Sequence, residues 1–473
     1  MWPAENEAGA EAENPYIEVT YEALSGEDRH AVRRQTVVPM SNAANRRKIA
    51  LFGTFGTGNL GNECTLQAML FNIRRRVPNA EVTCICTCPE ETASTYGIPA
   101  LAIREMPLRA TNNRAWRLLR KICVGIPVEL FRWCSVIKRL RGTHMLIMTG
   151  TGMLSDYGIG PLGLHYDILR WSVVAKLCRC KLLFVSVGAG PLRHPVARFF
   201  VKTALRLAAY RSYRDSFSKE YLKSIGFDAD DDAVYPDLAF SLPEGMLPDD
   251  QDNEHKDAPI GVGLITHYVQ RSLLDDAEQI YREYTTKMAS FVGWLLEHNR
   301  TVRLLIGDVV CDSRVRTDLR TLLERRGLTY EKSNIIDEPP GSFEELLSQL
   351  ARTKVVVASR FHNLLLALML GKPALAISFH EKDDSLMTAM GLQEFCQDIA
   401  NFDVSTLIEQ FIRLEENADR VRQEIRRKAK DYRRELDQQY SCIFDEIGSD
   451  LTQVTKGRLG GMRFGDTKPP GNQ

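Results

Sequence analysis

Arg360 and His362 stand two residues apart between two apolar stretches of the sequence. The run Lys354 to Ser359 predicts a strand before them, and the nearly all-apolar run Asn363 to Leu370 predicts a helix after them. A charged side chain in such surroundings costs free energy unless it meets an anion. We therefore predict that this pair grips an anionic ligand. The alternative for His362 is a core histidine that only binds a neighbouring carbonyl.

Further titratable residues follow the next predicted strand, Pro373 to Phe379. They are His380, Glu381 and Lys382. The carboxyl ends of parallel strands meet at one edge of a sheet, so these side chains are expected to converge with His362.

Arg214 follows another apolar run, Leu207 to Tyr213. At a strand end its guanidinium can hold a carboxylate or phosphate through two parallel hydrogen bonds. A structural ion pair with Asp215 or another acid is the alternative.

Three glycine-rich loops follow other predicted strands, at Gly53 to Gly61, Thr149 to Asp156 and Ser186 to Pro191. Glycines let backbone amides approach a ligand at the start of a helix. The candidate residues for an acceptor or a cleft in these loops are Gly58, Asn59, Gly152, Asp156 and Gly188.

Each of these loops has a simpler interpretation. Gly56 to Gly61 contains a formal G-x-G-x-x-G, but its loop is longer than a tight dinucleotide-binding turn and no acid stands at the carboxyl end of the second strand before Pro89. A glycine-rich turn can also merely pack, and Asp156 can cap the next helix.

A metal site is not predicted. Cys84, Cys86 and Cys88 alternate along a probable strand and cannot all face one ion. The acids beside His380 could bind a divalent cation, but a charged helix start explains them equally well.

The elements that position these residues alternate between β-branched runs, such as Lys48 to Gly53 and Lys181 to Val187, and helical stretches, such as one that begins near Asn62. This alternation predicts parallel sheets. With 473 residues, two domains are expected. The predicted fold is α/β, with two doubly wound, Rossmann-like lobes followed by helices that cover one lobe. The predicted divisions are a flexible acidic tail (1–45), an N-terminal lobe (46–245), a linker (246–258), a C-terminal lobe (259–402), C-terminal helices (403–450) and a flexible tail (451–473).

The composition is that of a globular protein, with 44% hydrophobic and 26% charged residues and a formal net charge of +0. No global field attracts nucleic acid, so nucleic acid is not expected as a partner. Eleven cysteines in apolar runs suit a reducing compartment. The acidic N-terminus is unlike a signal peptide, and no apolar run reaches roughly 18 residues. A cytoplasmic location is expected.

One stretch, Arg114 to Arg141, is both basic and aromatic. It is interpreted either as a membrane-facing segment or as a partly exposed pair of scaffold helices, and the scaffold is favoured. A peripheral contact with the inner face of a membrane is left open.

Together the loops resemble the polysaccharide pyruvyl transferase family over roughly Lys48 to Leu392. The landmarks read GTGNLGNE, TGTGMLSD, SVGAGPL, YRDSFSKEYLKSIGF with PDLAF after it, and ASRFHNLLLALMLGKPALAISFHEKDDSLMTAMGL. Two positions depart from the family pattern. Asn62 stands where an Asp is usual, and Thr149 to Gly152 replaces a glycine triplet.

The resemblance implies a fold similar to two-lobed GT-B glycosyltransferases and the transfer of pyruvate from phosphoenolpyruvate to sugar hydroxyls as a ketal. It also implies that the N-terminal lobe (46–245) is on the acceptor side and the C-terminal lobe (259–402) on the donor side. Phosphoenolpyruvate is then a co-substrate, and no cofactor is expected. By matching position, Arg360, Arg214 and Lys382 would bind the donor. His362 would be the general acid and base, with His380 in reserve.

The acceptor implied is a sugar of a polysaccharide or its precursor, either free or lipid-linked, which Asn59 and Asp156 would contact. A nucleotide-sugar glycosyltransferase on the same fold is the nearest alternative function. A non-catalytic glycan-binding descendant is the other, and the presence of Arg360 and His362 speaks against it. The number of subunits is not predicted.

Overall fold

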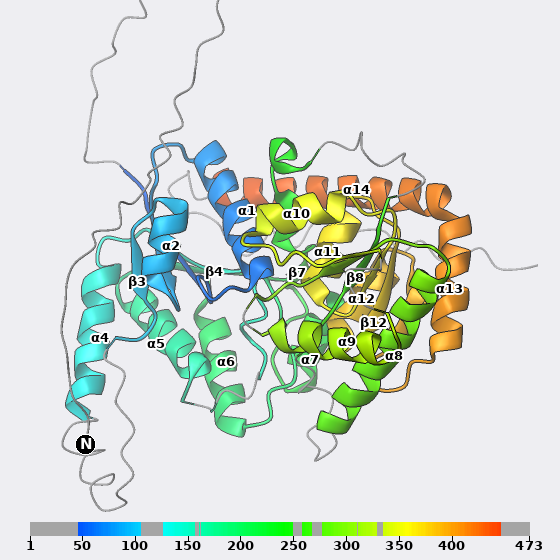
Figure 1. Cartoon of the computed structure of the whole chain (residues 1–473). Coiled ribbons are helices and arrows are strands. Elements are labelled where there is room, and N and C mark those ends of the chain that lie inside the picture. The colour runs from blue at the N-terminus through cyan, green and yellow to red at the C-terminus, as the bar shows by residue number, and fades with distance from the viewer. Residues whose placement is uncertain are drawn as a thin grey trace, which may run out of the picture. The chain divides into compact units, whose positions relative to one another are not determined.

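Two parallel β-sheets carry the fold, and their central strands are buried runs that the sequence predicted (Figure 1). The computed structural model describes residues 46–105, 126–156, 160, 162–248, 258–266, 277–309, 311–328 and 334–445. The predicted tails (1–45 and 451–473) and most of the predicted linker lie outside these residues. The division of the chain at 246–258 therefore stays a prediction.

The first sheet has the strand order β3-β2-β1-β4-β5-β6-β7, and neighbouring strands are parallel. Its strands are β1 (Lys48–Gly53), β2 (Glu81–Cys86), β3 (Ala100–Ala102), β4 (Met145–Thr149), β5 (Lys181–Val187), β6 (Tyr210–Tyr213) and β7 (Ala233–Val234). Its helices are α1 (Leu60–Arg76), α2 (Pro89–Tyr96), α4 (Ile126–Leu140), α5 (Leu164–Leu177), α6 (Pro195–Leu207) and α7 (Ser216–Ser224).

The second sheet has the order β10-β9-β8-β11-β12-β13 and is also parallel. Its strands are β8 (Ile260–Gly263), β9 (Val302–Leu305), β10 (Ile335–Ile336), β11 (Val356–Ala358), β12 (Ala374–Ser378) and β13 (Cys396–Asp398). Its helices are α8 (Ala277–Glu297), α9 (Ser313–Arg325), α10 (Phe343–Ala351), α11 (Phe361–Met369) and α12 (Glu381–Ala389). The short helices η3 (Leu238–Ser241) and η4 (Glu244–Met246) precede this sheet, and η7 (Gln393–Phe395) precedes β13.

Alternation along β1 shows how the first sheet is buried on both faces. Ile49 and Leu51 pack into one hydrophobic cluster that continues into the second sheet. Ala50 and Phe52 point the other way, into a cluster with α5 and α6. Strands of parallel sheets are covered on both faces, which is why they read as continuous apolar runs in the sequence.

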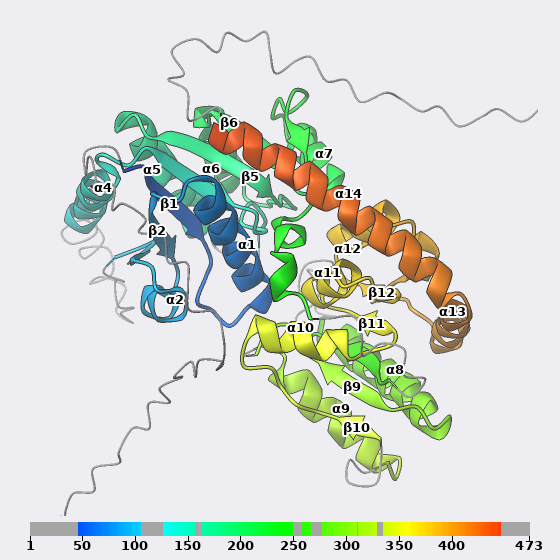
Figure 2. The ribbon, with the colours of Figure 1, turned by 90° about the horizontal axis from the view of Figure 1, so that it is seen from above.

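The C-terminal helices are α13 (Val404–Glu416) and α14 (Ala418–Asp445). The expectation that they cover one lobe is wrong for α14. Lys428 donates to the carbonyl of Ala389 at the end of α12. One end of the helix therefore contacts the second sheet's elements. Further along, Gln439 binds Ser212 on β6 in the first sheet. Figure 2 shows α14 running from α13 to β6. A long amphipathic helix can serve two cores, because its apolar stripe continues along its length.

Two helices begin earlier than predicted, and for α1 the capping residue explains the difference. Asn59 accepts a hydrogen bond from the amide of Asn62 at 3.3 Å and so starts α1 at Leu60. Arg360 is extended, with φ −102° and ψ 128°, and α11 starts at Phe361. His362 is consequently in the first turn of a helix and not in a loop before it.

Candidate functional site

The first glycine loop joins the two sheets. The carbonyl of Gly58 accepts from the amide of Val309 at 3.3 Å, and the amide of Leu60 donates to the carbonyl of Gly307 at 3.1 Å. Gly58 has φ +79°, a backbone conformation that favours glycine. Gly58 and Asn59, predicted as acceptor or cleft residues, therefore lie where the loop after β1 meets the loop after β9.

Asn62, which stands where the family usually has an Asp, makes hydrogen bonds within this loop. Its side-chain amide donates to the carbonyl and the hydroxyl of Thr54, both at 3.1 Å. A carboxylate could not donate to that carbonyl. The substitution thus has a local structural role on the β1 side of the loop.

His362 reaches across to the first sheet and lies directly against Gly61. A Cβ atom at Gly61 would stand 1.8 Å from Cγ of His362, so only glycine leaves room for the ring. Within the described residues, no hydrogen bond to the ring of His362 is found. The geometry does not match a core histidine held by a neighbouring carbonyl.

Arg360 is held from behind by Asp312. Its Nη2 atom donates to Oδ1 of this fully buried carboxylate at 2.5 Å. Asp312 also accepts from the amides of Thr266 and Asp308, at 3.1 and 3.2 Å. The anion that Arg360 needs is thus supplied in part by the protein itself, and its predicted contact with the donor stays a prediction.

Arg214 extends from the end of β6 to the second sheet. Its guanidinium lies 4.9 Å from the centroid of the Phe361 ring. It also pairs with Asp215 at 3.4 Å and with Asp237 at 3.5 Å, so the ion pairs considered as an alternative are present. Gly188 makes room for this side chain, since a Cβ there would stand 2.6 Å from Cζ of Arg214.

Lys382 approaches the same aromatic ring. Its Nζ atom is 4.9 Å from the centroid of Phe361 and 5.2 Å from that of Phe379. The side chain is buried, yet no hydrogen bond or ion pair of this ammonium group is found among the described residues. Phe361 therefore carries two cations that come from different sheets.

The electrostatic consequence appears at His362. Burial lowers its pKa well below the ordinary 6.5, and the positive charges of Lys382, Arg214 and Arg360 lower it further. The imidazole is neutral at neutral pH in the ligand-free protein. An anion bound among these cations would raise the pKa again.

His380 serves as the N-cap of α12. Its Nδ1 atom accepts from the amide of Lys382 at 3.2 Å, and its own amide donates to Asp383 at 3.2 Å. Burial raises the pKa of Asp383 to about 7. His380 also faces the first sheet, where its ring lies edge-on to Phe217 with centroids 6.0 Å apart.

The second and third glycine loops meet near His380. The amide of Asp156 donates to the carbonyl of Pro191 at 3.1 Å, and the carbonyl of Gly152 accepts from Ser155 at 3.2 Å. A Cβ at Gly190 would stand 2.7 Å from Oγ of Ser155 and 3.5 Å from Nε2 of His380. Gly152 and Asp156 are thus placed on the same edge as the other candidates, whereas their contact with a sugar is not tested.

A pocket of about 560 Å³ opens beside the two cations. Residues of both sheets and of α14 line it, among them Arg214, Asp237, Phe361, Lys382 and Tyr432. Burial raises the pKa of Asp237, and the charge of Arg214 opposes this rise. Phe361 lines this pocket, whereas its neighbours Arg360 and His362 are not among the lining residues.

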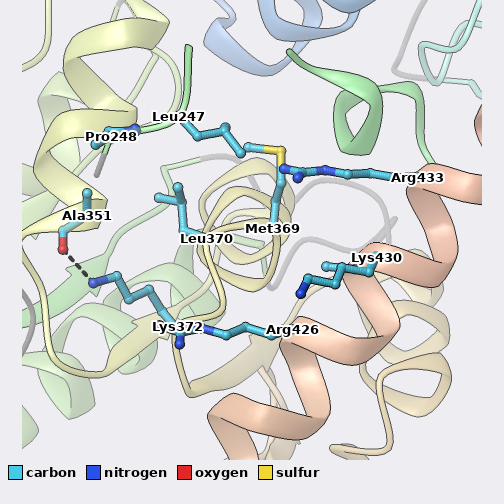
Figure 3. Close-up of a pocket in the computed structure, with 10 residues that line it drawn as sticks. Leu247, Pro248, Ala351, Met369, Leu370, Lys372, Arg426, Lys430 and Arg433 are labelled. Atoms are coloured by element: carbon cyan, nitrogen blue, oxygen red, sulfur yellow. Dashed lines mark hydrogen bonds between the residues drawn. The ribbon is translucent and has the colours of Figure 1, made fainter. Parts of the chain in front are cut away.

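A second pocket, of about 170 Å³, lies away from these residues (Figure 3). Lys372, Arg426, Lys430 and Arg433 stand around it. Lys372 is buried and donates to the carbonyls of Ala351 and Thr353, at the end of α10. Burial lowers its pKa to about 7. Cations at a helix C-terminus need no ligand, because they satisfy its free carbonyls.

Sequence reasoning missed Phe361, Asp312 and Gly61 as parts of this arrangement. Phe361 was visible between Arg360 and His362, but an aromatic in an apolar run gives no sign of which cations it will meet. Nothing marked Asp312. No cluster of three or more metal-ligating side chains occurs in the described part of the chain.

Residues 59–381 match the family model described as polysaccharide pyruvyl transferase, which is more than half of the chain. The chain belongs to the polysaccharide pyruvyl transferase family. It is also similar to the amylovoran biosynthesis protein AmsJ of Erwinia amylovora, with 20% identity over 407 residues, 80% of this chain and 95% of that protein.

Solved structures show the fold. A structure assigned as a UDP-N-acetylglucosamine 2-epimerase from Listeria monocytogenes has a TM-score of 0.58 and 12% identity, covering 85% of this chain and 97% of that one. A glycosyltransferase from Rickettsia africae has a TM-score of 0.55 and 10% identity, covering 86% and 100%. The predicted fold, two Rossmann-like lobes of GT-B type with C-terminal helices, is confirmed.

Proposed function

We propose that the chain transfers the enolpyruvyl-derived group of phosphoenolpyruvate to two hydroxyls of a sugar, in a polysaccharide or its precursor, as a ketal. The observation that carries this proposal is the pair of cations on Phe361, Arg214 and Lys382, placed beside a neutral His362. Family membership and the similarity to a protein of amylovoran biosynthesis support a transferase of polysaccharide biosynthesis.

Phosphoenolpyruvate carries a carboxylate and a phosphate, and two or more cations are needed to bind both. Arg214 offers a planar guanidinium suited to two parallel hydrogen bonds, and Lys382 offers a compact positive charge. Arg360 adds a third cation, oriented by Asp312. Negative charge is also favoured at the N-terminus of α11, where Phe361 and His362 lie.

His362 is the proposed proton carrier. Donor binding neutralises the surrounding cations and raises the pKa of the imidazole, which lets it accept a proton from the first attacking hydroxyl. That proton passes to C3 of the enol, and the sugar oxygen bonds to C2. The C2–O bond to phosphate breaks, the second hydroxyl attacks C2, and its proton leaves with the phosphate.

The remaining candidates have supporting roles in this proposal. His380 orients Lys382 through the start of α12 and is the reserve for proton transfer. Gly58 gives its loop the positive φ that the turn requires, and Gly188 leaves room for Arg214. Asn59, Gly152 and Asp156 lie on the edge where an acceptor sugar would approach.

The test is an incubation with phosphoenolpyruvate and a dihydroxy sugar acceptor, followed by phosphate release and by the mass shift of a pyruvate ketal on the glycan. His362→Ala is expected to lower kcat/KM by about 10² to 10⁴. Arg360→Ala is expected to lower it by about 10² or more, since a charged hydrogen-bond partner is lost. His298→Ala, at an exposed histidine, is the control and should leave the rate unchanged.

Full activity of both His362→Ala and Arg360→Ala would contradict the site. Turnover of a nucleotide sugar with no phosphate released from phosphoenolpyruvate would favour a glycosyltransferase instead. Circular dichroism of each variant shows whether a loss of rate comes from a loss of fold.

A further inference from the structure

The outward side of α4 is apolar. The side chains of Ile126, Leu130 and Phe131 are 57%, 62% and 50% exposed, and Pro127 and Cys134 are exposed beside them. Positions three and four residues apart share one side of a helix. The opposite side is the buried one. α4 thus presents to the outside the kind of surface that helices of globular proteins turn to the core.

The neighbouring helices α5 and α6, which lie beside α4 in Figure 1, also carry exposed apolar residues. Leu162, just before α5, is 66% exposed, and Val196 and Phe199 on α6 are 38% and 58% exposed. Side chains connect the three helices. Nε1 of Trp133 on α4 donates to the hydroxyl of Tyr166 on α5 at 3.2 Å, and the Tyr166 ring lies 5.5 Å from that of Phe200 on α6. We call the exposed residues Ile126, Leu130, Phe131, Leu162, Val196 and Phe199 the apolar rim.

The apolar rim lies at the carboxyl edge of the first sheet. Helices of a parallel sheet run opposite to its strands, so they begin at the edge where the strands end. Ile126, Leu162 and Val196 stand at or just before the first turns of their helices. The loops that hold Asp156 and Gly188 leave the strands at this same edge. The rim therefore borders the candidate site.

The exposed charges next to Val196 on the apolar rim are positive. Arg193 and Arg198 flank Val196 and are both exposed. The nearby carboxylates are engaged by other residues. Glu129 accepts from Arg170 at 2.9 Å, and buried Asp167 accepts from the same guanidinium at 2.6 Å. Apolar side chains next to exposed cations match the interface of a bilayer that contains anionic lipids.

We propose that the apolar rim docks on the surface of a bilayer with anionic phospholipids. The apolar side chains enter the boundary between headgroups and acyl chains, and Arg193 and Arg198 bind lipid phosphates. In the described part of the chain, no helix is long and apolar enough to span a membrane, so the contact is peripheral. A second copy of the chain fits less well, since a symmetric contact would bring these arginines together.

Docking in this way turns the carboxyl edge of the first sheet towards the lipid. A sugar acceptor attached to a membrane lipid could then reach the site without leaving the bilayer. That last step rests on the function proposed above, whereas docking itself does not.

The experiment is flotation of the full chain with vesicles of phosphatidylcholine alone or with about a third of phosphatidylglycerol. The chain is expected to float with the anionic vesicles and to bind them less at high salt. The double variant Leu130→Ser, Phe131→Ser should lower the partition coefficient about tenfold or more. Arg193→Glu should weaken binding to the anionic vesicles.

Leu177→Ser is the matched control. Leu177 is 68% exposed, but it is the last residue of α5 and so lies at the opposite edge of the sheet. This variant should bind vesicles as the unchanged chain does. Phe199→Ser is a second rim variant, and thermal melting checks that each variant folds.

Failure of the unchanged chain to float with either vesicle would overturn the proposal, as would equal binding by the double variant. Light scattering adds a further outcome. The unchanged chain could form a dimer and fail to bind vesicles. If the double variant Leu130→Ser, Phe131→Ser then dissociates that dimer, the rim is an interface between copies. Phosphate release from phosphoenolpyruvate with a water-soluble acceptor is measured separately, so failure of the transfer reaction and failure of docking are distinguishable.

Discussion

Gly61 and His362 pack directly against each other between the two sheets, so each limits which side chain fits at the other position. Because a Cβ at Gly61 would overlap the imidazole, a larger residue there must displace the ring or the backbone of α1. A displacement of about 1 Å is enough to lower the rate of an enzyme about a hundredfold.

Gly61→Ala is therefore expected to lower kcat/KM for phosphoenolpyruvate by about tenfold to a hundredfold, with the helices retained. Steady-state kinetics and circular dichroism measure the two effects. Gly245→Ala is the control, because no atom lies within 4 Å of its added Cβ. A Gly61→Ala variant with unchanged kinetics would show that the position of His362 does not matter.

Single residues were predictable where a charge stands at the end of an apolar run. Arg214 and Lys382 were both identified in this way, and the structure brings both to Phe361. Their shared partner could not be predicted, and neither could Asp312, which lies 48 residues before Arg360. Contacts over such separations depend on tertiary packing and leave no local pattern in the sequence.

At the scale of elements, the start of α12 contains a buried carboxyl group whose pKa is about 7. The folded protein holds this proton more tightly than the unfolded chain, where the ordinary value is 3.8. The contribution of Asp383 to stability is therefore present at low pH and is lost as the pH rises through this interval.

Asp383→Asn should remove this loss of stability at higher pH. The amide oxygen of Asn can still accept the hydrogen bonds from the backbone amides of Phe379 and His380. Relative to the unchanged chain, the variant should gain stability as the pH rises, by up to about 4 kcal/mol above pH 7. Urea unfolding at about pH 5 and about pH 8 measures this difference. Asp231→Asn, at an exposed position, should show the pH dependence of the unchanged chain. An Asp383→Asn variant with the same dependence would contradict the expectation.

Elements were predictable in proportion to their burial. The limits of β1 and β5 agree with the apolar runs Lys48 to Gly53 and Lys181 to Val187. The edge strands β7 and β10 have two residues each and were not predicted. A strand of that length has too few side chains to show a period, and its place depends on the neighbour that it pairs with.

For the whole molecule, α14 carries a buried polar link between its end and the first sheet. Gln439 donates to Oγ of Ser212 at 2.7 Å and to the hydroxyl of Tyr210 at 3.3 Å, and it accepts from Oγ of Ser186 at 3.2 Å. Ser186 has φ +47°, so this strand end is also strained.

Gln439→Ala leaves these buried hydroxyl groups without their partner and should lower the free energy of unfolding by about 2 to 3 kcal/mol. Chemical denaturation measures the change. Gln423→Ala, an exposed position on the same helix, should change it by less than about 0.5 kcal/mol. Equal stability of the two variants would show that the link does not hold α14 in place.

The general architecture followed from the alternation of strands and helices together with the family landmarks. The contact of α14 with both sheets could not be predicted from the sequence. Its periodicity predicts a helix with one apolar side, but a periodic pattern cannot say how many cores that side will cover.

Because Gln439 follows both sheets in the sequence, the ribosome makes it after them. The first sheet can assemble during synthesis, but the hydroxyl groups of Ser186 and Ser212 must wait for the last described helix. Domains usually complete their folding in order from the N-terminus. In this protein the first sheet is synthesised first but completes its hydrogen bonds last. A nascent chain that stalls before α14 therefore exposes an incomplete sheet to chaperones and proteases.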